Sequence, residues 1–585
     1  MLRLVLSRIS HAWYFSSMAT KVDAISGSVL LLGLIAITAL VTPWHNLEPV
    51  GLPKLTTLTV SVSLAGLLLI LFNKSPYKFP KVFFLSTLIA IALSLLNVLI
   101  NSQFISERIF GVQGRNFGAL ILVCLLLISI ISFGLSEKLD PKMLLTAIKL
   151  SSFLVAIYFL AQLQGLDRAA WVDAYSGIPS STLGNPNFVS AFVSIGFVST
   201  LPLLLARQTK WPIRTLIFLI SAIELYVSVE SNSFQGSAII LIGFFYVTMS
   251  FLKPILLRRK KGYLAAFFSL VTFSISYFLY RFQDFLSINN ATIQARLDYW
   301  EAGLAMGLNS PIFGRGFDYF GESYFLFRSE RAAVRSPGLY TDSAHNYFID
   351  LFAFGGFPLL LTVLLPIFLV IQRKFVSTFR LQNPLERNQE AEDVHRGIFL
   401  VWLGFLFQAM LSPFSIPLGY LGFLLTGFLF GSLSSIKKWG KPKDLSVKNR
   451  ITKEPLQIRP ISSKTMLKFL VVPILITLPI LGIQPIIADA KFRDAIEKGQ
   501  SEALYQIALT QPLSFQTMHF ASEIFLVNNR EDLAAQIISE MVTQNPENIR
   551  GWRLLDRISD TEAERVLTRS KILALDPKNP ELQKK

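Results

Sequence analysis

Residues 343–372, SAHNYFIDLFAFGGFPLLLTVLLPIFLVIQ, place a histidine and an asparagine directly before a long apolar run. An apolar run of about 20 residues is long enough to cross a bilayer as a helix. The stretch therefore predicts a transmembrane helix with His345 and Asn346 at its mouth. Because the chain has only five histidines, one at such a rim calls for a chemical explanation.

Similar apolar runs recur along the chain. Of its 585 residues, 52% are hydrophobic and only 16% are charged, and the mean hydropathy is +0.50, whereas a soluble domain carries about a quarter charged residues. We predict an all-α fold, a polytopic membrane protein with about 12–13 transmembrane helices. The predicted spans are 25–43, 55–73, 82–100, 116–135, 143–163, 186–206, 212–229, 236–252, 263–280, 346–371, 397–411, 417–435 and 468–487.

Cysteine usage excludes two features, and the N-terminus argues against a third. The single cysteine, Cys124, lies inside an apolar run, so it can form neither a disulfide within the chain nor a thiolate metal cluster. We expect no metal and no cofactor. Residues 1–24 carry basic residues but no uninterrupted apolar core before a cleavage site, which indicates a cytosolic segment rather than a cleaved signal.

Lysine and arginine predict the orientation of the spans. The segment 1–24 and every second loop after it hold 31 of these residues, and the alternate loops hold 9. The positive-inside rule places the basic set in the cytosol. These loops account for the net charge of +17 and the pI of about 9.7, so no nucleic-acid partner is needed to explain them.

The basic residues of the outer side are of one kind. Apart from Lys54 they are all arginines: Arg108, Arg115, Arg168, Arg296, Arg315, Arg328, Arg331 and Arg335. A guanidinium presents a planar fork that matches phosphate oxygens and remains charged. Arginines that reach the lipid–water interface along their apolar stems are the alternative interpretation.

The polar, glycine-bearing sequences fall on the same predicted outer side. They are ERIFGVQGRNFG (107–118), IPSSTLGNPNF (178–188), ESNSFQGS (230–237), QARLDYWEAGLAMGLNSPIFGRGFDYFG (294–321) and TDSAHNYF (341–348). The last two lie in a predicted loop of about 60 residues, 282–343, and a loop of that length is functional or disordered. Its aromatic residues and glycines favour a loop that folds against the membrane surface.

Two parts of this loop suggest a site for an anion. Thr341, Asp342 and Ser343 can cap the helix that follows, and its positive dipole end would then attract an anion and hold His345 neutral. Arg296 and Trp300 share one face of a predicted amphipathic helix. The alternatives are an ordinary interfacial His–Asn pair and an aromatic interface anchor at Trp300.

Charged residues inside the predicted spans need partners. Asp350 lies one turn beyond Asn346, and Glu224 lies in the seventh span. Ionisable residues at such depth are expensive and are usually paired. We expect Glu224 to be buried with a polar partner rather than to be catalytic.

Taken in order, GRNFG, GNPN, SFQG, RLDYW…SPIFGRG and AHNYFIDLFAFGGFP resemble the O-antigen ligase family of bacterial membrane glycosyltransferases. The resemblance covers roughly 25–435. It implies a GT-C-like helical fold that takes glycan from a polyprenyl diphosphate at the outer face of the cytoplasmic (inner) membrane. It also implies no nucleotide sugar and no obligatory metal, and an acceptor that is a lipid, a glycan or a protein.

The resemblance also implies roles for individual residues. Arg296 would bind the diphosphate and His345 would lie beside the acceptor as the base, which makes these two the expected catalytic residues. Gln235 stands where many ligases have an arginine, so Arg115 or a loop arginine would substitute for it. The remaining residues expected to bind substrate, in addition to Arg115 and Gln235, are Asn187, Asn346 and Arg315.

From about residue 488 the sequence changes to soluble helical patterning. Its A…I/L…NP or DP spacing of about 34 residues resembles tetratricopeptide repeats. We therefore divide the chain into 1–24, a transmembrane glycosyltransferase-like domain 25–487, and a small helical-repeat domain 488–585. The last is either a platform for a protein partner or acceptor, or a stabilising appendage.

Two other classes of function compete with glycan transfer. A transporter or flippase of lipid-linked glycan would show internal repeats and charges spread through its spans, whereas here the charges gather in the outer loops. A scaffold that presents the repeats would not explain five polar motifs on one face.

Overall fold

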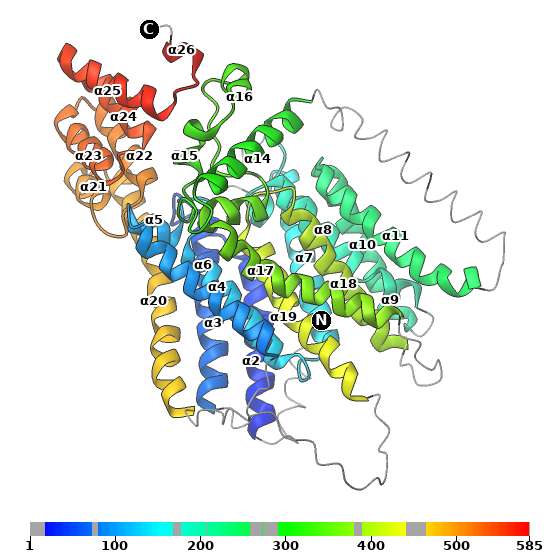
Figure 1. The fold of residues 1–585 in the computed structure, drawn as a ribbon. Coiled ribbons are helices and arrows are strands. Elements are labelled where there is room, and N and C mark those ends of the chain that lie inside the picture. The colour runs from blue at the N-terminus through cyan, green and yellow to red at the C-terminus, as the bar shows by residue number, and fades with distance from the viewer. Residues whose placement is uncertain are drawn as a thin grey trace.

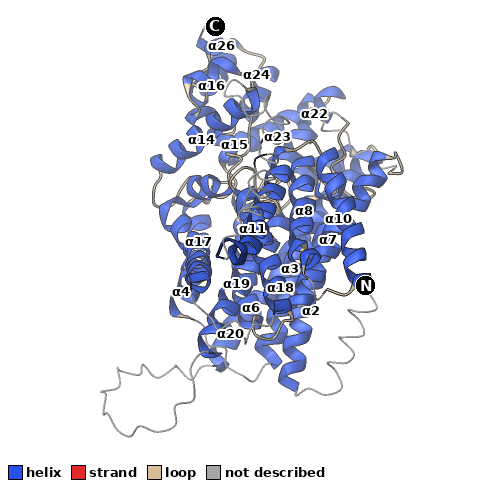
Figure 2. Ribbon diagram, turned by 90° about the vertical axis from the view of Figure 1, so that its right-hand side faces the viewer, coloured by secondary structure: helices blue, strands red, loops and turns tan. Residues whose placement is uncertain are grey.

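The computed structural model describes residues 18–72, 80–167, 177–206, 209–257, 272, 276, 290–379, 389–439 and 464–583. In this part of the chain all regular structure is helical, which confirms the predicted all-α class (Figures 1 and 2). Most of the predicted N-terminal segment 1–24 and of the predicted span 263–280 lies outside the described residues, as does Arg168.

The other twelve predicted spans each correspond to a helix or a helix pair. These are α2 (Met18–Ala39), α3 (Gly51–Phe72), α4 (Lys81–Ile100), α6 (Ala119–Leu135), α7 (Pro141–Leu163), α8 (Pro186–Ser199) with α9 (Leu201–Leu205), α10 (Trp211–Glu230), α11 (Phe234–Leu257), α17 (Tyr347–Phe379), α18 (Gln389–Ala409), α19 (Ile416–Trp439) and α20 (Lys464–Glu497). Among the described residues, eight helices are long and apolar enough to cross a membrane, and three shorter helices are apolar. The chain is therefore a multi-pass membrane protein.

Small residues let these helices approach one another closely. Helix α6 packs on α19, where a Cβ on Gly427 would collide with the backbone of Ser129. The Ser129 hydroxyl donates to the carbonyl of Phe423 at 2.8 Å. Helix α4 also contacts α19, where the ring of Phe83 stacks on that of Phe430 with centroids 4.7 Å apart. Helices α2, α3 and α20 pack beside this pair, and α7, α8, α10, α11 and α18 form the other side of the bundle (Figure 1).

A charged pair is buried inside the second group of helices. Lys149 of α7 and Glu224 of α10 approach to 2.5 Å, and both side chains are almost fully buried. Ser152 donates to the other carboxylate oxygen at 2.5 Å, and Ser221 accepts from the ammonium group at 2.9 Å. Glu224 therefore has the polar partner that the sequence led us to expect, and the pair is neutralised where it lies.

Four short helical segments and the longer helix α14 cover one end of the bundle. They are α5 (Ile105–Phe110), the 3₁₀ turn η2 (Ser181–Leu183), α14 (Ala291–Asn309), α15 (Phe320–Phe327) and α16 (Glu330–Arg335). Helices α14–α16 and the tail described next lie together at the same end of the molecule in two views a quarter turn apart (Figures 1 and 2). We call this end the loop face.

Helix α20 continues past the predicted boundary at 487 to Glu497 and carries a helical tail, residues 498–583. The tail consists of α21 (Ser501–Ala508), α22 (Phe515–Val527), α23 (Glu531–Gln544), α24 (Ile549–Ile558), α25 (Glu562–Leu575) and α26 (Pro580–Gln583). Helices α22 with α23 and α24 with α25 pack as successive pairs. Their core includes Met518, Ile537 and Met541, all buried. The tail packs against the loop face (Figure 1).

Candidate functional site

The turn before α17 is built by its own side chains. His345 adopts a left-handed conformation with φ of +54°, and its backbone N–H donates to the hydroxyl of Ser343 at 2.7 Å. The cap of α17 is Asn346, whose side-chain oxygen accepts from the N–H groups of Phe348 and Ile349 at 3.0 and 3.2 Å. The expectation that Thr341, Asp342 and Ser343 cap the helix is therefore wrong, because the left-handed residue moves the helix start to Asn346.

The imidazole of His345 is half-buried, and its ring nitrogens make no hydrogen bond within the described residues. It stacks on the ring of Tyr299 from α14, with centroids 5.4 Å apart. Burial, followed by the positive charge of Arg296, lowers the pKa of His345 to about 4, against a smaller opposing effect of Asp342. The imidazole is therefore neutral at physiological pH, and burial is the main cause.

Arg296 is a cation without a carboxylate partner in the described part of the chain. One of its N–H groups donates to the carbonyl of Leu411, between α18 and α19, at 2.6 Å. Burial lowers its pKa from the ordinary arginine value, and only Tyr299 opposes this. A half-buried guanidinium without a counter-ion attracts an anionic ligand.

Two side-chain amides, those of Gln235 and Asn187, are linked by hydrogen bonds to the region around Leu411. The side-chain oxygen of Gln235, in the first turn of α11, accepts from the hydroxyl of Ser412 at 2.8 Å, next to Leu411 in sequence. Its amide nitrogen is buried with no partner among the described residues. Asn187, in the first turn of α8, accepts from Ser233 at 2.8 Å. Helix starts that are far apart in sequence are thus linked to the Arg296 site.

Arg115 is the centre of a carboxylate cluster. It lies 3.6 Å from Asp318, 3.3 Å from Asp342 and 3.0 Å from Asp350. Although burial would lower the pKa of Arg115, Asp342, Asp350 and then Asp318 raise it. Asp350 also accepts from the N–H of Ala344 at 2.8 Å. The charge of Arg115 is already neutralised, and its contacts hold the turn that carries His345.

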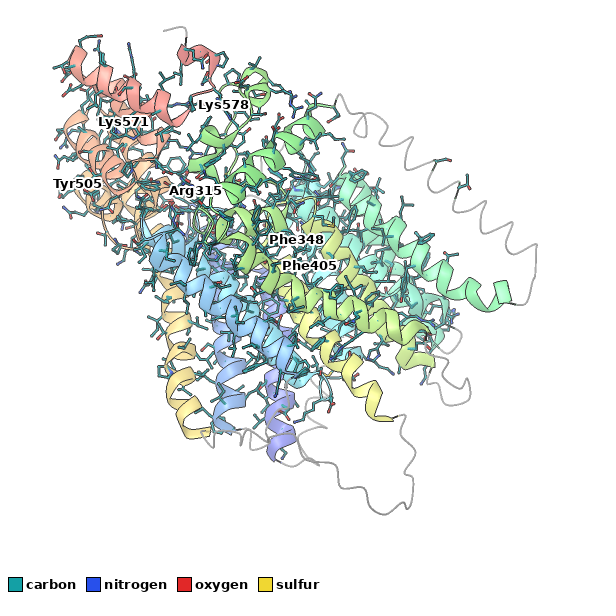
Figure 3. The ribbon with its side chains drawn as sticks, in the orientation of Figure 1. Arg315, Phe348, Phe405, Tyr505, Lys571 and Lys578 are labelled. Carbon is teal, nitrogen blue, oxygen red and sulfur yellow. The ribbon has the colours of Figure 1, made fainter. Side chains whose placement is uncertain are left out.

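The remaining outer arginines are engaged elsewhere. Arg315 pairs with Glu547 of the tail at 2.6 Å, and Figure 3 shows it beside the tail, whereas Phe348 lies deeper in the bundle. Arg328 pairs with Asp576 of the tail at 2.7 Å. The other described outer arginines are used within the loop face: Arg108 stacks over Tyr319, Arg331 pairs with Glu301, and Arg335 pairs with Asp298.

Two glycine-containing motifs, one in the outer loop and one in α17, are held together beneath the loop face. Helix α17 is broken at Gly356, with φ of +71°. The break leaves the carbonyls of Ala353 and Phe354 to accept from the N–H groups of Arg315 and Gly316 at 2.8 and 3.0 Å. The two most specific sequence motifs, SPIFGRG and the AFGGFP end of the other, are thus joined by backbone hydrogen bonds.

Sequence reasoning missed Tyr299 and the Leu411 carbonyl. Tyr299 stands three residues from Arg296, and that spacing on one helix face was the available signal. No local pattern marks a carbonyl as a partner. Trp300, considered as an interface anchor, packs half-buried against the membrane core, and its indole nitrogen is buried without a partner among the described residues.

The fold and this site define a polytopic α-helical membrane protein with a cationic, polar site on its loop face. Within the described ranges, no three side chains of His, Cys, Asp or Glu are grouped so as to hold a metal. Residues 216–364 match the family model of the O-antigen ligases. The matched range runs from α10 to α17 and contains Gln235, Arg296 and His345. A search of the curated proteins finds no match to the chain.

The match supports the O-antigen ligase resemblance over this part of the chain. That family implies glycan transfer of the ligase or polymerase type, a lipid-linked glycan as substrate, and a membrane setting.

Proposed function

We propose that this protein transfers glycan from a polyprenyl diphosphate to an acceptor at the outer face of the cytoplasmic membrane. The observation that carries the proposal is the neighbourhood of two groups: Arg296, which has no counter-ion among the described residues, and the neutral imidazole of His345. A diphosphate leaving group needs a fixed positive charge, and an attacking hydroxyl needs a base. The same small region supplies both.

Arg296 binds the diphosphate of the donor. Its guanidinium can offer several N–H donors to phosphate oxygens, and one of its contacts, with Leu411, fixes its position. In a half-buried site, its charge stabilises the negative charge that develops as the glycosidic bond to the diphosphate breaks. The diphosphate leaves with the bonding electron pair.

His345 takes the proton of the acceptor. The acceptor oxygen bonds to the anomeric carbon as the donor bond breaks, and its proton passes to a ring nitrogen of His345. Because the pKa of His345 is about 4, the imidazolium gives that proton up readily, and a diphosphate oxygen takes it. The stack on Tyr299 holds the ring in place during both steps.

The polar residues around Arg296 and His345 have different roles. The amide nitrogen of Gln235, which has no partner in the described part of the chain, is suited to an oxygen of the sugar or of the diphosphate. Asn187 is linked to this region through its hydrogen bond with Ser233. We assign Asn346 and Arg115 to positioning, since one caps α17 and the other is surrounded by carboxylates. Arg315 is assigned to docking of the tail.

The test is transfer in liposomes that contain the purified protein, a polyprenyl-diphosphate glycan and an acceptor. We expect Arg296→Ala to lower kcat by about 10²–10³-fold, the usual effect of removing one charge-stabilising donor. We expect His345→Ala to lower it by about 10²–10⁴-fold. Arg331→Ala is the matched control, because Arg331 is an exposed arginine of the same face, and it should transfer as the wild type does.

Two results would count against the proposal. If both alanine variants retain full transfer, these residues do not form the site. If the wild type moves labelled lipid-linked glycan across the bilayer and joins it to nothing, the protein is a transporter without catalysis.

A further inference from the structure

The tail is joined to the loop face by a buried ion pair. Arg328, at the end of α15, and Asp576, at the end of α25, are both fully buried, and one guanidinium nitrogen lies 2.7 and 3.0 Å from the two carboxylate oxygens. Lys578 donates to the carbonyl of Arg328 at 2.9 Å. Arg553 of the tail also lies 3.7 Å from Asp576. Removing the charge of Asp576 would therefore leave the buried Arg328 without its carboxylate partner, which is costly.

Further contacts extend this interface. Arg315 pairs with Glu547 at 2.6 Å, and Tyr319 donates to Asn545 at 2.7 Å. On the other side of the tail, the ring of Phe515 stacks on Phe104 with centroids 3.6 Å apart. The tail therefore contacts both the large outer loop and the segment before α5.

One part of the interface contacts the stretch of chain that precedes His345. The second terminal guanidinium nitrogen of Arg328 donates to the carbonyls of Ser336 and Pro337 at 3.2 and 2.9 Å. Tyr340 lies under the guanidinium of Arg550 at 3.7 Å and packs in an apolar cluster with residues of the tail. We call residues 336–346 the His345 segment. The tail holds its first half, and Arg115 holds its second half through Asp342.

We propose that the tail is a positioning element of the transfer site, in which Asp576 acts through Arg328 to fix the His345 segment. The inference rests on the proposed function. A base displaced by about 1 Å can lose about 10²-fold in rate even when the change lies far from the chemistry. The tail thus supports the catalytic geometry, in addition to any partner that it binds.

The first test is Asp576→Asn in the full-length protein, which removes the charge and keeps the shape. We expect kcat for glycan transfer to fall by about tenfold or more, with KM for the donor little changed, because the base is misplaced while Arg296 is intact. Without substrate, amide hydrogen exchange over 336–346 should become faster than in the wild type. Arg557→Gln is the matched control, because it breaks an exposed ion pair with Glu523 inside the tail.

If Asp576→Asn does not fold, a second pair of variants tests the positioning role of the tail. Arg315 and Glu547 are both partly exposed, so their charges can be exchanged. We expect Glu547→Arg to lower kcat and to speed exchange over 336–346. Adding Arg315→Glu should restore both, which a direct role of Arg315 in phosphate binding would prevent.

The failure of this proposal is distinct from that of the proposed function. Exchange and kcat in Asp576→Asn equal to those of Arg557→Gln would overturn the positioning role, and so would a charge exchange that restores nothing. If the wild type transfers no glycan, the proposed function falls, and the exchange rates alone then decide whether the tail fixes the segment.

Discussion

At the scale of the residue, burial makes two polar side chains chemically different from their exposed forms. His345 has a neighbouring cation and a stacked ring but no acceptor for its nitrogens in the described residues. Arg296 has a single carbonyl and no carboxylate there. Burying either side chain in its charged form costs free energy. Ionisable groups perturbed in this way cluster at functional sites.

The pH dependence of transfer follows from His345. Its pKa in the folded protein is about 4, so the imidazole is neutral and able to act as a base above about pH 5. We expect kcat/KM of the wild type to show no loss from His345 between about pH 8 and pH 5, and a fall as pH approaches about 4. An acid limb near the ordinary histidine value of about 6.5 would show that burial does not lower the pKa of His345.

Stability supplies a measurement of the same group without substrate. Because the folded pKa of about 4 lies below the unfolded value, the unfolded chain binds the proton more readily between about pH 6.5 and pH 4. The contribution of neutral His345 is therefore present above about pH 6.5 and is lost as pH falls through this window. The melting temperature of the wild type relative to His345→Gln should fall over the same range.

The outer arginines could not be distinguished by sequence alone. Their common side favours anion binding for all of them, yet five of those described form ion pairs with carboxylates of the loop face or tail. Asp576 and Glu547 are more than 200 residues away from their partners in sequence. No local spacing reports such a contact, and only folding brings the charges together.

At the scale of the element, the break in α17 is the feature that a hydropathy pattern does not predict. The span was expected as one helix over 346–371, whereas Gly356 interrupts it with φ of +71° and ψ of −174°. The Gly-Gly pair was visible in the sequence, but its partner, the 311–316 turn, could not be recognised without the hydrogen bonds that join them.

Gly356→Ala tests the importance of this break. Alanine strongly disfavours that backbone conformation, and its Cβ would lie 2.5 Å from the carbonyl oxygen of Pro311. We expect the free energy of unfolding to fall by about 1–3 kcal/mol and transfer to fall with it. Gly338→Ala is the control, since nothing lies within 4 Å of a Cβ there. Equal melting temperatures in detergent for the two variants would contradict this account.

At the scale of the whole molecule, the predicted outer segments do gather at one end. Helices α5, α14, α15 and α16 and the tail lie together, opposite the far ends of α2, α3 and α20 (Figure 1). The lysine and arginine count assigns this end to the exterior. That assignment remains a prediction.

Cysteine labelling in intact cells tests the sidedness. Gly338→Cys creates an exposed thiol on the loop face, and Glu137→Cys creates one in the loop between α6 and α7 at the predicted cytosolic side. We expect an impermeant thiol reagent to label the first in intact cells and the second only after permeabilisation. The wild type is the blank, because Cys124 is buried. Labelling of position 137 alone would reverse the orientation.

The sequence by itself determined the helices of the membrane domain, because twenty apolar residues have few stable alternatives to a helix in a bilayer. It also predicted Arg296, His345 and Gln235 as polar residues of one side. The tertiary structure decided which of the arginines pair with carboxylates and which remain available to a ligand. An arginine acquires its role from the carboxylates that folding brings within about 4 Å, and those arise from loops and a tail far away in the chain.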